Sequence, residues 1–318
     1  MRYVIYGAGA IGGTIGGRLF AHGRDVAFIA RGAHLEAMRS SGLTLHTPAE
    51  AQTLRVPVAG SPTELDWRDG DVALLAMKSQ DTQAALEALR DAAGDVPVIC
   101  AQNGVANERM ALRLFSRVYG MVVWMPATHL TPGEVVAHSG KVTGCLDAGV
   151  YPQGTDDLIE SVAADLRDST FKCDANQRVM RLKYAKLLSN LLNIVQALCE
   201  GGAAGDLVRQ VRDEANAVYE AAGIDSATPE ELADRTSGIA IDAVPGFEGR
   251  PGGSTWQSLT RGGSLETDYL NGEIALLGAL QGVPTPYNRM LQQVAAEAQR
   301  EGRGPGSYTP ESLLALIP

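Results

Sequence analysis

Residues 2–13 read RYVIYGAGAIGG, and this stretch decides the fold. The part RYVIY predicts a strand, and residues 14–22 predict a helix. The pattern G-x-G-x-x-G between a strand and a helix is typical of a dinucleotide-binding turn. In another context the same pattern would mean little, because the chain has 36 glycines.

Each glycine of this turn has its own role. Gly7 permits the tight turn, Gly9 lets a pyrophosphate approach the backbone, and Gly12 lets the helix pack closely on the strand. The free N–H groups at the start of the helix then face the phosphates. The expected cofactor-binding residues are Gly7, Ala8, Gly9, Ala10, Ile11 and Gly12.

A second predicted strand, residues 25–30, ends at Arg31. In an NAD site we would expect Asp or Glu here, accepting from the ribose 2′-OH, whereas an arginine suits a 2′-phosphate. An arginine at a strand end can also be a solvated surface group. The sequence therefore favours NADP(H) as the cofactor.

The composition excludes several classes of protein. A net charge of −10 without a basic stripe argues against a nucleic-acid partner. No apolar run reaches the roughly 20 residues of a membrane helix, and the N-terminus has no cleavable signal pattern. The four cysteines show neither metal-ligand nor C-x-x-C spacing, so we expect reduced thiols, no metal and a cytoplasmic location.

The length of 318 residues suggests about two domains. In the first half, predicted strands alternate with helices, and residues 71–77 form a nearly continuous apolar run typical of a strand covered on both faces. This alternation predicts a parallel sheet with crossover helices. Further apolar runs are expected to extend the sheet as antiparallel strands: residues 119–125, 134–138 and 141–146.

Later in the chain the pattern changes to helix-spaced apolar residues. We place the domain boundary near Asn176, with an α/β domain over residues 1–176 and a mainly helical domain over residues 177–318. Residues 236–263 are rich in Gly and Pro, which predicts a functional lid or a flexible loop. The apolar residues 313–317 could cap their own domain or that of a partner in a homodimer.

Three polar residues follow strand ends in the first domain: Arg31, Lys78 and Asn103. In open parallel sheets, ligands bind outside the carboxyl ends of the strands. Lys78 could reach cofactor phosphate or adenine, and Asn103 could position the nicotinamide ribose or the substrate. The alternative is a plain turn, because Asn-Gly is a common turn pair. The recurrence on successive strand ends favours a site.

A second polar cluster lies in the helical half. Lys186, Asn190 and Asn193 are spaced i, i+4 and i+7, which predicts one polar stripe on a helix otherwise rich in leucine. Buried amide and ammonium groups without partners are costly, so the stripe either needs partners or faces water. Solvated helix faces usually carry Glu, Lys and Arg, so two asparagines favour a site.

A site that reduces a ketone needs a proton donor, because hydride addition leaves negative charge on oxygen. None of the five histidines is well placed among the predicted elements, so Lys186 is the candidate general acid. A carboxylate near Lys186 would hold its ammonium group in place. Sequence spacing alone does not choose between Glu266 and Asp268 for this role.

Together these residues resemble the ketopantoate reductase family, or 2-dehydropantoate 2-reductases, over nearly the whole chain. The matching motifs are GAGAIGG at 7–13, Arg31, KSQ at 78–80, QNG at 102–104, KLLSN at 186–190 and LETDYLNG at 265–272, with Ser254 at the family's substrate serine. The resemblance implies an α/β fold: an N-terminal Rossmann-type doubly wound sheet with a C-terminal mainly helical domain of the 6-phosphogluconate dehydrogenase type.

The resemblance also implies roles. NADPH would reduce the C2 ketone of ketopantoate, a small-molecule 2-oxo acid, to pantoate for pantothenate and coenzyme A synthesis. Lys186 would be the general acid, Glu266 would orient it or bind substrate, and Arg31 with Lys78 would bind the 2′-phosphate. The expected substrate ligands are Asn103, Asn190, Asn193 and Ser254, and Asn103 and Glu266 are also expected to contact the cofactor.

Two departures from the family concern the substrate side. The family often has Asn eight residues after the catalytic lysine, where this chain has Ile194 preceded by Asn193. The family pattern S-M-x-x-D becomes STWQS at 254–258 and loses its Asp. A paralogue that reduces another 2-oxo acid is therefore an alternative. A non-catalytic NADP(H)-binding sensor is a further one, although a sensor would not need Lys186 and Glu266.

Overall fold

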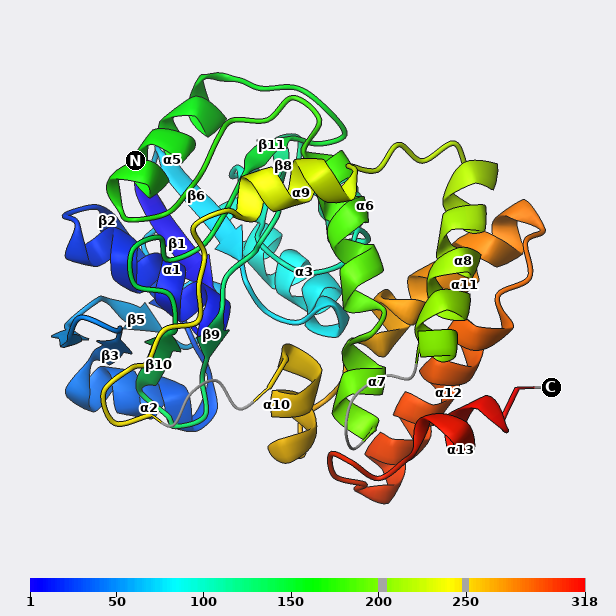
Figure 1. Cartoon of the computed structure of the whole chain (residues 1–318). Helices are drawn as coiled ribbons and strands as arrows, with labels where there is room; N and C mark the ends of the chain where they lie inside the picture. Colours follow the sequence, from blue (N-terminus) through cyan, green and yellow to red (C-terminus); the bar gives the residue numbers. More distant parts are fainter. Residues whose placement is uncertain (200–204, 248–251, 318) are drawn as a thin grey trace. The chain divides into compact units, whose positions relative to one another are not determined.

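We describe the fold from a computed structural model, which covers residues 1–199, 205–247 and 252–317 (Figure 1). These residues form two compact units. Unit 1 contains the described residues of Met1–Asn103, Asn107–Lys183 and Pro229–Arg250, and unit 2 those of Gly104–Ala106, Tyr184–Thr228 and Pro251–Pro318. Because both units are made of discontinuous segments, they do not test the predicted division into two consecutive domains, and the boundary near Asn176 stays a prediction.

Unit 1 is built on a seven-stranded sheet. Its strands are β1 (Arg2–Tyr6), β2 (Asp25–Ile29), β5 (Val58–Ala59), β6 (Asp71–Leu75), β7 (Val98–Cys100), β8 (Val118–Met121) and β11 (Ala148–Val150). They lie in the order β11-β8-β7-β6-β1-β2-β5, and all neighbours are parallel except β8 and β11. The strand order reverses between β1 and β6, which confirms the predicted Rossmann-type α/β fold.

Helices connect these strands or follow the last of them: α1 (Ala10–Ala21), α2 (Gly32–Ser41), α3 (Thr82–Ala93), α4 (Asn107–Leu112) and, after β11, α5 (Asp157–Asp168). The strand β6 is buried along its whole length, as its continuous apolar run predicts. The helix α3 lies between β6 and β7, where the predicted alternation of strands and helices requires a crossover helix.

The helix α1 contacts the main sheet and also a second sheet of four strands. The second sheet has the order β4 (Ala51–Leu54), β3 (Leu43–His46), β10 (Glu134–Ala137) and β9 (Ala127–Thr128). A Cβ on Gly16 would lie 2.5 Å from Phe28 of the main sheet, and one on Gly13 would lie 2.7 Å from Val135 of the second sheet. The glycines of α1 therefore let one helix pack closely on both sheets.

The predicted antiparallel extension of the main sheet is confirmed in part for one run and wrong for the other two. The run at 119–125 gives β8, which extends the main sheet and pairs in parallel with β7 and antiparallel with β11. The run at 134–138 gives β10, which lies in the second sheet and pairs in parallel with β3. The run at 141–146 forms no strand, and only isolated bridges at Cys145 pair it with Trp124 and Lys172. Apolar β-rich runs specify burial, whereas tertiary packing chooses the partner and its direction.

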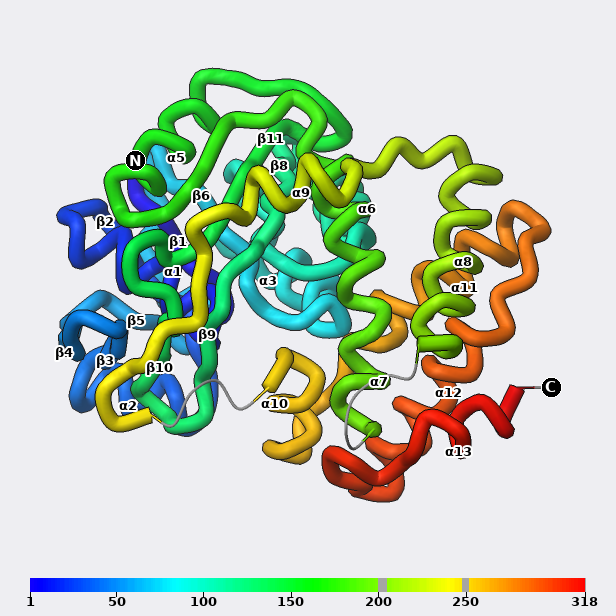
Figure 2. Tube along the Cα trace, viewed as in Figure 1, coloured from blue at the N-terminus to red at the C-terminus, as the bar shows by residue number. Residues whose placement is uncertain are grey.

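Residues 229–247 come late in the chain but belong to unit 1. Figure 2 shows residues 237–247, in yellow, beside β9 and β10, and the N–H of Asp242 donates to the carbonyl oxygen of His138 at 2.7 Å. The helix α9 (Pro229–Thr236) precedes them. Nε of its Arg235 donates to Oδ2 of the buried Asp147 at 2.7 Å, so a short helix distant in sequence is fixed to unit 1.

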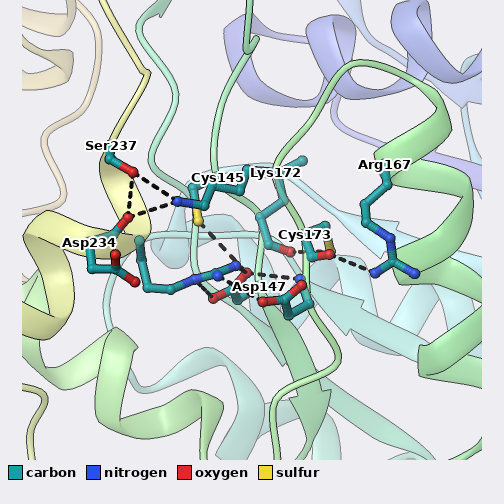
Figure 3. Close-up of polar contacts among 10 residues, drawn as sticks. Cys145, Asp147, Arg167, Lys172, Cys173, Asp234 and Ser237 are labelled. Atoms are coloured by element: carbon teal, nitrogen blue, oxygen red, sulfur yellow. Dashed lines mark hydrogen bonds and ion pairs between the residues drawn. The ribbon is translucent and has the colours of Figure 1, made fainter.

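A second set of contacts fixes the end of α9, and Figure 3 shows its residues converging on one side of Asp147. Nζ of Lys172 donates to the carbonyl oxygen of Asp234 at 2.7 Å and to the hydroxyl of Ser237 at 3.1 Å. The prediction of an unbroken loop over 236–263 is wrong where the helix α10 (Ser254–Thr260) forms. Residues 248–251 lie outside the described residues, and a lid role stays a prediction.

Unit 2 is mainly helical, as the sequence predicts. It holds the end of α6 (Val179–Asn190), α7 (Asn193–Leu198), α8 (Gly205–Ala221), α10, α11 (Asn271–Gln281), α12 (Pro286–Glu301) and α13 (Pro310–Leu314), with the 3₁₀ turn η3 (Thr267–Tyr269). The helix α11 packs on α8 and α12, and α7 packs on α10 and α12. Across residues 1–199, 205–247 and 252–317, no helix combines the length and apolar character that crossing a membrane requires.

The C-terminal segment of unit 2 covers the end of α7. The N–H of Tyr308 donates to the carbonyl oxygen of Leu198 at 2.9 Å, and Leu313 is fully buried. Half of Leu316 stays exposed. The apolar end thus caps its own unit in part, and the homodimer stays a prediction.

Candidate functional site

The carboxyl ends of the central strands in unit 1 are level with one another. Tyr6 of β1 lies opposite Ile29 of β2 and Leu75 of β6, and Leu75 lies opposite Cys100 of β7. The segments that follow these strands therefore leave the sheet at one edge, where ligands bind in such folds. They carry the predicted residues Gly7, Arg31, Lys78 and Asn103.

The glycine loop has the shape that its sequence predicts. Gly7 has φ of 102°, and a Cβ there would lie 2.8 Å from the backbone N of Met77. A Cβ on Gly12 would lie 2.0 Å from the carbonyl oxygen of Gly7. Any side chain at either position would clash with the backbone, so the turn requires both glycines.

Gly9 is different, because a Cβ there would meet no heavy atom within 4 Å. Gly9 is also the N-cap of α1 and supplies no side-chain hydrogen bond to the first N–H groups of the helix. Unsatisfied N–H groups and the positive end of the helix dipole attract anions. Open space beside these groups is suited to a pyrophosphate.

Arg31 is the N-cap residue of α2, and its side chain is 80% exposed. Its guanidinium donates to the carboxylate of Asp81 at 2.7 Å. Burial raises the pKa of the nearby Tyr6 phenol, and the charge of Arg31 opposes that rise. The half-buried Lys78 begins the 3₁₀ turn η2 (Ser79–Asp81), which leads to Asp81. Two cationic residues thus lie at this edge of the sheet, Arg31 after β2 and Lys78 after β6, on either side of β1.

Asn103 is positioned by a buried polar network that sequence reasoning missed. Nδ2 of Asn107 donates to the carbonyl oxygen of Asn103 at 3.0 Å, and Oδ1 of Asn107 accepts from Thr82 at 2.9 Å. Nε2 of Gln102 donates to Thr82 at 2.7 Å and to the carbonyl oxygen of Met77 at 3.0 Å. The network ties the ends of β6 and β7 together beneath Asn103.

A buried ion pair supports the same turn. Nζ of Lys183 lies 2.5 Å from Oε1 of Glu108, and both side chains are almost wholly inaccessible. Lys183 also donates to the carbonyl oxygen of Gln102 at 2.9 Å. Removing one partner of such a pair would leave a buried, uncompensated charge. Charged residues on helices normally indicate a solvated face, so no sequence pattern pointed to this pair.

The single helix predicted to carry Lys186, Asn190 and Asn193 is interrupted, and their common polar stripe stays a prediction. The helix α6 ends at Asn190, and α7 begins at Asn193. Lys186 and Asn190 are therefore one helical turn apart on α6, while Asn193 belongs to the next helix. Lys186 and Asn193 are half-buried.

A residue distant in sequence binds the backbone at the break between α6 and α7. Nδ2 of Asn271, at the start of α11, donates to the carbonyl oxygen of Leu191 at 3.1 Å and to Oδ1 of Asn288 at 3.0 Å. Nδ2 of Asn288 donates to the carboxylate of Glu214 at 2.7 Å. Both asparagines are fully buried, so this network holds the break between α6 and α7 in one geometry.

Asn190 contrasts with this satisfied network. Its side chain is only 5% exposed, yet its Nδ2 makes no hydrogen bond among the described residues. A buried donor without an acceptor costs roughly 1–3 kcal/mol. A ligand that brings an oxygen to this amide would recover that energy.

The other predicted residues of unit 2 lie on separate elements. Ser254 begins α10, is exposed, and its carbonyl oxygen accepts from the hydroxyl of Ser258 at 2.9 Å. Glu266 is half-buried at the N-cap of η3. Asp268 is exposed and accepts from Nε2 of Gln292 at 2.7 Å.

The predicted residues divide between the two units. The cofactor-binding set lies in unit 1 except for Glu266, and the catalytic and substrate-binding set lies in unit 2 except for Asn103. Apart from these two exceptions, the residues of each set lie in one unit and come from more than one of its secondary-structure elements.

Comparison with known proteins gives two family-model matches. The model described as "Ketopantoate reductase PanE/ApbA" matches residues 3–148, and "Ketopantoate reductase PanE/ApbA C terminal" matches residues 179–299. A 2-dehydropantoate 2-reductase of Archaeoglobus fulgidus is 30% identical over 302 residues, which cover 91% of this chain and 95% of that protein.

Solved structures agree with this match. The crystal structure of a PanE/ApbA family ketopantoate reductase from Ralstonia eutropha JMP134 has a TM-score of 0.79 and 28% identity, covering 95% of this chain and 100% of that one. The ternary structure of D-mandelate dehydrogenase with NADH and anilino(oxo)acetate has a TM-score of 0.80 and 22% identity, covering 95% and 99%. The second likeness shows the fold alone.

Proposed function

Because the chain belongs to the ketopantoate reductase family, we propose that it is an NADPH-dependent reductase converting the C2 ketone of 2-dehydropantoate to the hydroxyl of pantoate. The observation that carries this proposal is the buried amide of Asn190, which has no acceptor among the described residues and lies one turn from Lys186. A substrate oxygen would supply the missing acceptor. In the same proposal the enzyme works in the cytoplasm, and pantoate feeds pantothenate and coenzyme A synthesis.

The glycine loop and the edge of the sheet in unit 1 hold the cofactor in this proposal. The N–H groups at the start of α1 bind the pyrophosphate beside Gly9, where the structure has open space. Arg31 and Lys78 bind the 2′-phosphate, and Asn103 and Glu266 contact the nicotinamide end. Arg31 suits this role because it is exposed and already pairs with an anion, the carboxylate of Asp81. NADPH, when bound, supplies the hydride.

The residues of unit 2 deal with the substrate and the proton. Lys186 donates a proton from Nζ to the ketone oxygen as C2 accepts the hydride, so the oxygen becomes the C2 hydroxyl. Glu266 holds the ammonium group of Lys186 or binds substrate. The hydroxyl and carboxylate groups of the 2-oxo acid bind to Asn103, Asn190, Asn193 and Ser254.

A second candidate is reduction of a different 2-oxo acid, and α10 favours it. Where the family has an Asp, this chain has Ser258, whose hydroxyl donates to the carbonyl oxygen of Ser254 within the same helix. A carboxylate of the family pattern is therefore absent at this position of the sequence. The fold is also that of D-mandelate dehydrogenase, which acts on a different acid.

The test is an assay of NADPH oxidation against a panel of 2-oxo acids. The panel contains ketopantoate, short aliphatic 2-oxo acids and phenylglyoxylate, each also assayed with NADH, and the product is identified by chromatography. We expect the highest kcat/KM for ketopantoate with NADPH, and pantoate as product. A higher kcat/KM for another acid would favour the second candidate, and the absence of oxidation with every acid would reject a reductase.

A further inference from the structure

His34 on α2 makes two hydrogen bonds that together fix its protonation. The backbone N–H of Gly133 donates to Nδ1 at 2.8 Å, so Nδ1 carries the lone pair. Nε2 lies 2.7 Å from the carbonyl oxygen of Ala8, which can only accept. The neutral imidazole with its proton on Nε2 satisfies both contacts. His34 therefore donates to the glycine loop while it accepts from a different part of unit 1.

Nδ1 of His34 accepts from Gly133, which directly precedes β10 and is itself bonded to the second sheet. Gly133 has φ of 83°, and its carbonyl oxygen accepts from the N–H of Thr44 in β3 at 2.8 Å. The ring of His129 lies 4.3 Å from the ring of His34, and its Nδ1 bonds the carbonyl oxygen of Glu134 at 2.9 Å. These contacts hold the imidazole in one orientation, independently of the glycine loop.

The donor side of His34 acts on the peptide that opens the phosphate-binding turn. A trans peptide is planar, with its C=O and N–H groups pointing in opposite directions. When His34 holds the carbonyl of Ala8, the N–H of Gly9 must point away from His34 and α2. Ala8 is 3% exposed, whereas the space beside Gly9 is open. Gly9 supplies no side-chain cap that could order the start of α1.

We propose that His34 is a positioning residue for the cofactor, which holds the Ala8–Gly9 peptide in the orientation that receives the pyrophosphate of NADP(H). The inference rests on the proposed function, because it assigns His34 to that same cofactor site. Fixing a backbone residue costs roughly 1–2 kcal/mol, so a loop that His34 already orders binds its ligand more tightly. His34 does not need to touch the cofactor for this effect.

The two contacts can be separated by a matched pair of variants. In His34→Gln the side-chain amide falls near the position of Nε2 and can donate to Ala8, whereas in His34→Asn it falls near Nδ1 and can only serve Gly133. We expect His34→Asn to weaken NADPH binding about tenfold in fluorescence titration, with kcat at saturating NADPH unchanged. We expect His34→Gln to stay within about twofold of the wild type.

A second measurement needs no cofactor. In the cofactor-free protein, amide hydrogen exchange at residues 9–11 should be faster in His34→Asn than in the wild type, and similar to the wild type in His34→Gln. His22→Asn, at an exposed histidine, is the control for loss of an imidazole. If His34→Asn does not fold, His34→Gln decides alone, because a tenfold loss of NADPH affinity in that folded variant would overturn the proposal.

The outcomes separate this inference from the proposed function. Equal NADPH affinity and equal exchange in the wild type and His34→Asn would overturn the positioning role while leaving the reductase intact. A wild-type protein that binds neither NADPH nor NADH would reject the proposed function and this inference with it. Weaker binding and faster exchange in His34→Asn, with both restored in His34→Gln, would support it.

Discussion

The glycine loop of unit 1 and the α6–α7 break of unit 2 present functional groups in different ways. The loop offers backbone N–H groups, and its shape follows from residues at 7, 9 and 12 that are neighbours in sequence. The break offers the side chains of Lys186, Asn190 and Asn193, and its shape depends on Asn271, 80 positions after Leu191. A backbone site is thus encoded locally, whereas a side-chain site depends on remote support.

The energetics of the two regions also differ. At the start of α1 the open N–H groups are next to open space, so water can satisfy them until a ligand arrives. At the end of α6 the amide of Asn190 is buried and lacks an acceptor. If Asn190 binds substrate as proposed, unit 2 gives up stability for function at this residue, and unit 1 does not.

The largest effect is expected at Lys186. Lys186→Ala should lower kcat by about 100- to 10,000-fold, the range for loss of a general acid, because it removes Nζ, the proposed proton donor. NADPH affinity should stay unchanged, since the glycine loop is untouched. Steady-state kinetics and NADPH titration measure both, with Lys141→Ala at an exposed lysine as the control. Near-normal turnover in Lys186→Ala would show that Lys186 is not the general acid. The comparison between the two units would then lack a catalytic side chain in unit 2.

The next prediction separates the two asparagines of the break. Asn190→Leu should lower kcat/KM about 100-fold, yet its unfolding free energy should be unchanged or higher, because a buried donor without an acceptor disappears. Asn271→Leu should lower the unfolding free energy by about 2–3 kcal/mol, because the acceptors on Leu191 and Asn288 lose their donor. Urea denaturation and steady-state kinetics give the two quantities.

Asn216→Leu, at an exposed position of α8, controls for placing a leucine in unit 2. If Asn190→Leu proved as destabilising as Asn271→Leu, the side-chain amide of Asn190 would already be hydrogen-bonded in the ligand-free protein, and its role would be structural. The contrast between a satisfied network and an open amide would then be wrong.

Sequence reasoning succeeded where the determinants are local. The parallel sheet, the glycine turn and the helix α3 follow from apolar periodicity and glycine spacing, which neighbouring residues fix. It failed at the continuous helix predicted over Lys186, Asn190 and Asn193, because helical spacing carries no information about a break that another helix stabilises. The ion pair of Lys183 and Glu108 was missed for the same reason, since its burial depends on which elements meet.

Arg31 tests the unit 1 side of the comparison. Arg31→Ala should raise the dissociation constant of NADPH by roughly 10- to 30-fold and leave that of NADH nearly unchanged, because only NADPH carries the 2′-phosphate. Titration with both cofactors measures the ratio, and Arg113→Ala at an exposed arginine is the control. An unchanged preference would mean that the pair of Arg31 with Asp81 is only a surface contact.

The smallest effect concerns the pH dependence of His34. Burial, and secondarily the charge of His129, lowers the pKa of His34 to about 4 from the ordinary value of 6.5. Between these values the unfolded chain takes up a proton that the folded protein does not, so this group makes the unfolding free energy fall as pH drops from about 6.5 to about 4. Because the side chain is only half-buried, solvent screening limits the loss to about 1 kcal/mol. His34→Gln removes the titrating group, so its urea-denaturation curve should lose less stability than the wild type over this window. Parallel pH profiles of the two proteins would instead show that folding does not oppose protonation of Nδ1, and the N–H that Gly133 donates to Nδ1 would then not be what keeps His34 neutral.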